Sequence, residues 1–184
     1  EHEHARLGQH LMGLVRRQLI QPDPAAFAGE DSFRFSHVLI REAVYEGLPK
    51  ERCSDLHERL ADRLAAENAE DEVIGHHLEQ AFRCRAQLGL AGPRERELAV
   101  LAQARLEAAA RKVLLGGDPH AAIDLLERAA SLLPPDDPDR LGVLPALGAA
   151  LFEGGRLVDA DRVLQEAIDH DEADDLLRAL ARVE

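Results

Sequence analysis

Two stretches of helical spacing frame the first 49 residues. Over residues 7–20 the apolar positions recur every three or four residues, which predicts an amphipathic helix that the QPDP at 21–24 ends. Apolar residues return to the same spacing over 38–48, and Pro49 closes this second predicted helix because the residue before a proline avoids helical backbone. The part of the chain between the two helices has a different pattern.

That intervening part alternates with a period of two. Phe33 and Phe35 are flanked by polar neighbours, which is the pattern of a half-buried strand. The turn-rich residues before them allow a small two-stranded hairpin near 19–36, whose second strand would cover 32–36. A helix, a hairpin and another helix are therefore expected in this order.

Two further helices are predicted over 50–92. Residues 50–68 and 71–85 each carry apolar or small residues at spacings of three and four, with charged residues between them. In the second of these helices the positions expected to face inward are Val73, Ile74, His77, Leu78 and Ala81. A glycine-containing break at 86–93 follows, where we expect a domain or subdomain boundary.

Residues 93–184 repeat themselves with a shift of 38 positions, over 106–134 and again over 144–172. The residues that match the tetratricopeptide (TPR) pattern are Leu106, Ala109, Ala110, Val113, Ala122, Leu126, Ala129 and Pro134, then Leu144, Leu147, Gly148, Leu151, Ala160, Leu164 and Ala167. Gly117 and Gly155 fall in the same turn between helices. Because small residues let two antiparallel helices approach closely, we predict a TPR-like α-solenoid of stacked helix pairs, with a truncated third repeat from 177.

Composition supports an all-α fold with at most this small hairpin. Apolar residues make up 46% of the chain, aromatic residues only 3%, and tryptophan is absent, so alanine and leucine must build the core. The net charge is −13, and both halves of the chain are acidic. The basic residues near 34–52 lie among glutamates, so no direct binding to nucleic acid is expected.

No apolar run is long enough to span a membrane and no signal peptide is recognisable, so we expect a cytoplasmic protein without membrane contact. Cys53 and Cys84 lie 31 residues apart in two predicted helices, and reduced thiols are expected in that compartment.

One stretch has a specific resemblance. The pattern F-x-F-x-H, then an apolar run and R-E-A-x-Y, then a basic turn and L-H-x-x-L-A, covers 33–61. It resembles the end of the winged-helix domain in STAND-type regulatory ATPases, which include bacterial LuxR-type and SARP-type transcription regulators and some class III adenylate cyclases. In that group a helical repeat arm follows the winged helix. The resemblance implies that 1–49 is the C-terminal part of a winged-helix domain, that 50–92 is a linking helical region, and that 93–184 is the arm. Both ends would then fall inside recognisable units, so we expect a fragment of a longer protein.

His37 is the first candidate for a functional residue. The resemblance implies that this histidine contacts the phosphate of ADP bound to a preceding nucleotide-binding domain in the resting state. An imidazole N–H is a compact donor for a phosphate oxygen. The alternative is a histidine that only caps the helix that begins at Val38, and the sequence leaves both interpretations open.

The sequence gives little indication of a metal site or a catalytic site. His57, His76 and His77 with Glu79 lack the H-E-x-x-H spacing of a zinc site, and partly buried, hydrogen-bonded histidines at 57 and 77 are the expected alternative. Cys53 has a histidine four residues later, but no glycine loop that would stabilise an oxyanion. We therefore predict no catalytic residue, no metal and no enzyme activity, and no cofactor beyond ADP or ATP in the parent protein.

The expected function is a non-catalytic, regulatory and protein-interaction part of a larger bacterial signalling ATPase. It would couple the binding of a protein or peptide on the repeat arm to the nucleotide state of the preceding domain. Candidate groove positions are those predicted to face solvent on the first helix of each pair, namely Arg105, Glu107, Arg111, Lys112, Val143 and Ala146. The alternative is a free-standing TPR-like adaptor scaffold that binds a peptide or partner protein. The partner's identity, the output domain and the oligomeric state are not encoded in a recognisable form.

Overall fold

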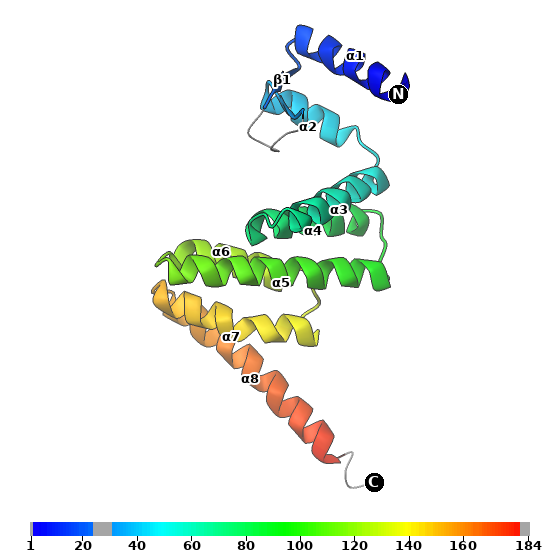
Figure 1. Ribbon diagram of the computed structural model, residues 1–184. Helices are drawn as coiled ribbons and strands as arrows, with labels where there is room; N and C mark the ends of the chain where they lie inside the picture. The colour runs from blue at the N-terminus through cyan, green and yellow to red at the C-terminus, as the bar shows by residue number, and fades with distance from the viewer. Residues whose placement is uncertain (1, 24–30, 181–184) are drawn as a thin grey trace. The chain divides into compact units, whose positions relative to one another are not determined.

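A computed structural model describes the backbone of residues 2–23 and 31–180, and the side-chain surroundings of residues 6–23 and 31–169. The chain divides into two compact units, Glu1–Pro49 and Lys50–Glu184, and each unit is described by itself. Within the described residues, one two-stranded hairpin is the only sheet and all other regular elements are helices (Figure 1). The predicted all-α class with a small hairpin is confirmed.

The first unit contains a helix, a hairpin and a helix. Its elements are α1 (His2–Arg16), β1 (Ile20–Pro22), β2 (Phe33–Phe35) and α2 (Val38–Glu46). The strands pair antiparallel, with Ile20 opposite Phe35 and Pro22 opposite Phe33. This register places the end of the hairpin directly before α2.

The first helix is shorter than predicted at its C-terminal end. Gln18 adopts a left-handed conformation with φ 56°, and the Leu19 amide donates to the Leu14 carbonyl at 3.1 Å. This arrangement terminates a helix. Ile20, which the helical pattern assigned to the helix, instead lies in β1 as a buried strand residue.

The second unit is a stack of helix pairs. Its elements are α3 (Lys50–Ala66), α4 (Asp71–Ala86), α5 (Pro93–Leu115), α6 (Pro119–Ala130), α7 (Pro138–Glu153) and α8 (Leu157–Leu180). Each helix packs against the next, and Figure 1 shows α3/α4, α5/α6 and α7/α8 following one another along the unit. Since α4 packs closely on α5, the break at 86–93 is a turn inside one unit and not the predicted boundary.

The same turn joins the two helices of every pair. Asn68, Gly117 and Gly155 hold φ values of 53°, 86° and 76°, the left-handed region that glycine and asparagine tolerate best. In each case the next amide donates to a carbonyl five positions back, namely Ala69 to Leu64 (2.9 Å), Asp118 to Val113 (3.3 Å) and Arg156 to Leu151 (2.8 Å). Residues 50–86 of the predicted linking helical region therefore form a third helix pair of the same kind.

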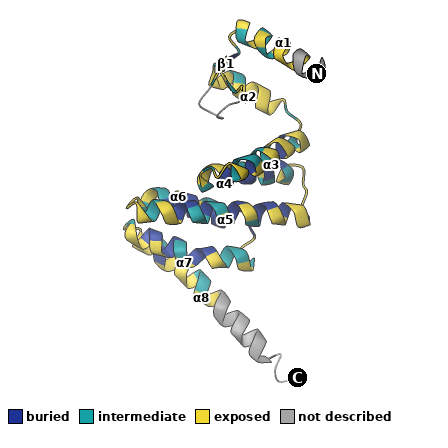
Figure 2. Ribbon diagram, viewed as in Figure 1, coloured by how far each residue is buried: buried dark blue, intermediate teal, exposed yellow. Residues whose placement is uncertain are grey.

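Small residues line the contacts between helices of the second unit. Among the fully buried positions are Ala81, Ala99, Ala102, Ala122, Ala129 and Ala150. Leucines such as Leu98, Leu106 and Leu144 fill the space between them, and Figure 2 shows this buried stripe along α5 and α7. Leu164 departs from the predicted core pattern, since it is 37% exposed while it lies against Gly148.

The predicted third repeat from 177 stays a prediction. Residues 177–180 continue α8 without a break, and the structure does not describe their side chains. Residues 181–184 lie outside the described part of the chain.

Candidate functional site

His37 occupies the junction between β2 and α2. Its backbone is extended, with φ −141° and ψ 138°, and its carbonyl accepts the amides of Ile40 and Arg41 at 3.1 and 3.3 Å. It is thus the N-cap residue of α2 by position. Its side chain is exposed and makes no capping hydrogen bond, so the interpretation of His37 as a side-chain cap is not what the structure shows.

The helix that follows His37 exposes apolar side chains. Within α2 no residue is buried, and Val38, Leu39 and Val44 each expose more than half of their surface. The amphipathic spacing that predicts this helix therefore produces an apolar face that the described residues of the first unit leave uncovered. Exposed apolar surface of this kind marks contact sites for other protein surfaces.

The predicted groove residues of α5 are engaged in ion pairs. Arg105 Nη1 lies 2.8 Å from Asp71 Oδ1, and Lys112 Nζ lies 2.7 Å from Asp71 Oδ2. The hydrogen bonds from Lys112 and Arg105 lower the pKa of the Asp71 carboxyl below its usual value. Arg111 pairs with Glu107 one turn away, at 2.6 Å. These side chains remain at the surface, but two of them fasten the start of α4 to α5.

The other two groove candidates were predicted to face solvent, and this is wrong. Val143 is fully buried and Ala146 packs against the core. The physical reason is that α7 contacts α5, α6 and α8. A helix covered on several sides does not have the single solvent-facing side that the prediction assumed for the first helix of each pair. Val73 was likewise predicted to face inward, whereas it is exposed beside the buried Ile74 on α4.

The hollows on the second unit centre on α6. One of about 600 Å³ is lined by Glu72, Ala121, Asp124, Leu125, Glu127, Arg128 and Ser131. Two more share Ser131 with it, one reaching the C-terminal end of α4 and one lying between α6, α7 and α8. These three hollows are lined by residues of α4, α6, α7 and α8.

A buried carboxylate joins these two helices. Glu79 on α4 is 3% exposed, and its oxygens accept from Arg83 on the same helix and from Arg128 on α6, each at 3.1 Å or less. Burial alone would raise the pKa of Glu79, but the hydrogen bonds from Arg128 and Arg83 outweigh it, so the pKa lies below its usual value. Glu79 is therefore an ionised link between two helix pairs. Arg128, its partner on α6, also lines the hollow that contains Glu72 and Asp124.

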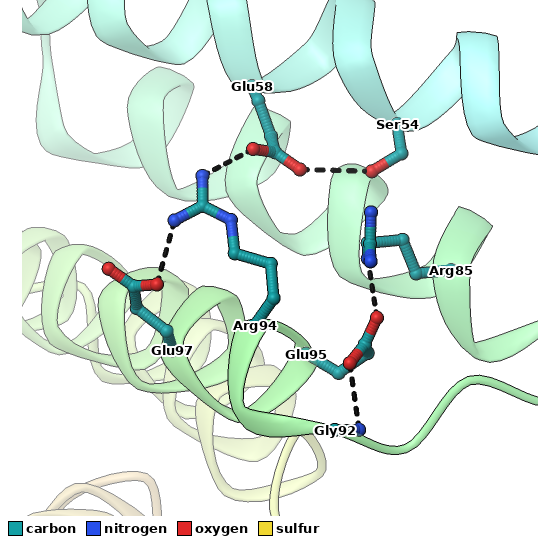
Figure 3. A network of polar contacts seen from close by, with 7 residues as sticks. All are labelled: Ser54, Glu58, Arg85, Gly92, Arg94, Glu95 and Glu97. Atoms are coloured by element: carbon teal, nitrogen blue, oxygen red, sulfur yellow. Dashed lines mark hydrogen bonds and ion pairs between the residues drawn. The ribbon is translucent and has the colours of Figure 1, made fainter.

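A second polar network holds α3, α4 and α5 together (Figure 3). Ser54 on α3 donates to Glu58, and Glu58 in turn accepts from Arg94 at the start of α5. Arg85 near the end of α4 donates to Glu95 on α5 at 2.6 Å. Since Ser54 and Glu95 are buried, these contacts fix the register of the three helices.

Two of the histidines, His57 and His77, lie in direct contact. Nδ1 of His57 on α3 lies 2.9 Å from Nδ1 of His77 on α4, so the prediction of partly buried, hydrogen-bonded histidines is confirmed. Burial and the neighbouring His57 and His76 lower the pKa of His77 to about 4. Within the described ranges, no three histidine, cysteine or carboxylate side chains come together in a way that could hold a metal ion.

The sequence did not indicate that the two cysteines meet. Cys53 on α3 and Cys84 on α4 are both buried, and their Sγ atoms lie 2.6 Å apart. The sequence pattern places each cysteine only on the inward-facing stripe of its own helix. Only the antiparallel register of α3 and α4 brings them together.

The chain matches no protein-family model, and no curated protein matches it. Among the residues that the structure describes, no helix combines the length and the apolar character that a membrane span requires.

Proposed function

We propose that this chain is a non-catalytic, regulatory and protein-interaction part of a STAND-type bacterial signalling ATPase. In this proposal the first unit is the C-terminal part of a winged helix that contacts the nucleotide-binding domain. The second unit is the TPR-like arm, and partner binding on the arm changes the nucleotide state. The proposal places the protein in the cytoplasm, where ATP is available.

The observation that carries the proposal is the environment of His37. Its imidazole is exposed at a strand-to-helix junction and has no capping role, and the helix behind it exposes Val38 and Leu39. An apolar helix face beside an exposed hydrogen-bond donor suits a contact with a second domain that presents a phosphate. ADP or ATP would belong to that second domain.

The second unit supports the partner-binding half of the proposal. Stacked helix pairs give an extended surface to which each pair contributes side chains. The hollow along α6 is lined by the carboxylates of Glu72, Asp124 and Glu127. With a net charge of −13 on the chain, the favoured partner is a protein or peptide segment that carries basic residues.

The test is ADP affinity in the full-length protein, measured by calorimetry for the wild type and for His37→Ala. A hydrogen bond to a charged phosphate is worth about 1.5 to 3 kcal/mol, so His37→Ala should weaken ADP binding roughly tenfold or more. His10→Ala is the matched control because His10 is an exposed histidine on α1 of the same unit. Unchanged ADP affinity in His37→Ala would contradict the sensing role.

The free-standing adaptor is separated from this proposal by a second measurement. Co-purification of the chain with the nucleotide-binding segment is compared in ADP-loaded, ATP-loaded and nucleotide-free forms. The regulatory proposal expects association that depends on ADP and weakens in His37→Ala. Association that ignores the nucleotide would favour a scaffold that acts through its repeats alone.

A further inference from the structure

Two buried thiols meet between the first two helices of the second unit. Cys53 is 1% exposed and Cys84 is 3% exposed, and their Sγ atoms are 2.6 Å apart. A disulfide bond is about 2.0 Å long, so its formation needs a further approach of only about 0.6 Å. The sequence contains no other cysteine, so an intramolecular disulfide has only one possible pairing.

The position of the thiols follows from the register of α3 against α4. Cys53 lies in the first turn of α3 and Cys84 in the last turn of α4, which are the ends that meet in an antiparallel pair. The contact between His57 and His77, further along the same two helices, requires the same register. The histidine contact and the thiol contact thus agree on one register of α3 against α4, and this register places the two thiols side by side.

We propose that Cys53 and Cys84 are a redox-modification site that hydrogen peroxide closes to a reversible disulfide. One thiolate Sγ attacks a peroxide oxygen, the O–O bond breaks, and the leaving hydroxide takes a proton to form water. The second Sγ attacks the resulting sulfenic sulfur. The S–S bond forms, the S–O bond breaks, and the departing hydroxide takes the second thiol proton to form another water. The two thiols lose two electrons and two protons, and the peroxide is reduced to two waters.

The bond would tie α3 to α4 covalently. In the second unit α3 packs mainly on α4, and the ion pair of Glu58 with Arg94 adds a polar contact to α5. A bridge across 31 positions removes conformational freedom from the unfolded chain and raises the melting midpoint, by about 10 °C for a chain of this size. This inference goes beyond the proposed function and does not depend on it.

The test treats the folded chain with hydrogen peroxide, blocks remaining thiols by alkylation and measures the intact mass. The expected product has lost two hydrogen atoms, carries no alkyl group, yields a linked peptide containing Cys53 and Cys84, and reverts on reduction with dithiothreitol. Cys53→Ala and Cys84→Ala should each lose this product.

Three results would overturn the proposal: two alkylated thiols after treatment, sulfinic acids in place of the disulfide, or a disulfide between two chains. The wild-type melting midpoint, measured before oxidation, after oxidation and after reduction, keeps the test decisive if an alanine variant fails to fold. A midpoint that does not rise on oxidation and fall again on reduction would also overturn the proposal.

Discussion

Gly148 on α7 is the position where the close approach of α7 and α8 can be tested most directly. A Cβ atom at Gly148 would lie 2.5 Å from Leu164 Cδ2 and 2.6 Å from its Cγ, whereas a Cβ at Gly142 on the same helix would meet nothing within 4 Å. Both glycines are helical, so Gly142→Ala is a matched control for Gly148→Ala. The two substitutions should change stability in opposite directions.

The magnitudes follow from two competing effects. Alanine is preferred over glycine inside a helix by about 0.5 to 1 kcal/mol, and both variants gain this amount. Gly148→Ala in addition forces Leu164 to move at its branch point, not only at the far end of the side chain, and overpacking costs about 1 to 3 kcal/mol. Since Leu164 is 37% exposed and has room to turn outward, the net loss for Gly148→Ala should be about 1 kcal/mol.

The assay is urea unfolding followed by helical circular dichroism, which gives the midpoint and the slope for each variant. Leu164→Ala removes the clashing branch, so Gly148→Ala should be better tolerated in that background, with a coupling free energy of about 1 kcal/mol or more. Equal stabilisation by the two glycine substitutions, with no coupling to Leu164, would refute the close approach of α7 and α8.

Two further predictions concern buried charge and pH. Glu79→Gln should lower the free energy of unfolding by about 1 to 2 kcal/mol, because it weakens the hydrogen bonds of a buried side chain to two partly exposed arginines. Glu67→Gln removes an exposed ion pair and should cost about 0.5 kcal/mol or less. Equal losses in the two urea titrations would contradict a special role for Glu79. The pKa of His77 is lowered from 6.5 to about 4 in the folded chain, so the unfolded chain binds more protons between these values and stability should fall as pH drops from 7 to 5. Allowing for solvent screening at a half-buried site, His77 contributes about 1 to 2 kcal/mol to this loss of stability. The urea midpoint of His77→Gln should therefore depend less on pH over this range. Identical pH profiles for the variant and the wild type would contradict a role for His77.

Local periodicity predicted most of the helices and their ends. The predicted helices over 50–68 and 71–85 correspond to Lys50–Ala66 and Asp71–Ala86. The first helix was the exception, because Ile20 fits both a helical stripe and a strand. The pairing of Ile20 with Phe35 decided between them, and such a pairing is not visible in a local pattern.

The helix pair of 50–86 shows what a repeat search misses. The two recognised turns use glycine at 117 and 155 and lie 38 positions apart, whereas the corresponding turn uses Asn68, 49 positions before Gly117. Asparagine tolerates the left-handed conformation through its short polar side chain, so the same backbone recurs without the same letter. A search for a fixed residue at a fixed shift therefore cannot find it.

The candidate site was less predictable than the fold because it depends on contacts between helices. The exposed junction at His37 follows from a local pattern, since the strand ends and the helix begins beside it. The Glu79 contact with Arg128 spans 49 positions, and its geometry depends on how α4 and α6 each pack against α5. Val143 is buried for the same reason, since three neighbouring helices cover α7.

The ion pair of Glu79 with Arg128 would also couple partner binding at the α6 hollow to α4. Arg128 lines the α6 hollow and holds the Glu79 carboxylate, which is buried on α4. A basic partner bound to the nearby carboxylates would bring like charge close to Arg128, and displacement of Arg128 would leave Glu79 with Arg83 alone. Loss of one charge-assisted hydrogen-bonded partner at a buried carboxylate costs on the order of 1 to 3 kcal/mol. That is the size of the coupling free energies that connect separate sites, and α4 also carries the histidine and cysteine contacts to α3. Occupation of the hollow and the packing of α3 against α4 would therefore be energetically linked through a single helix.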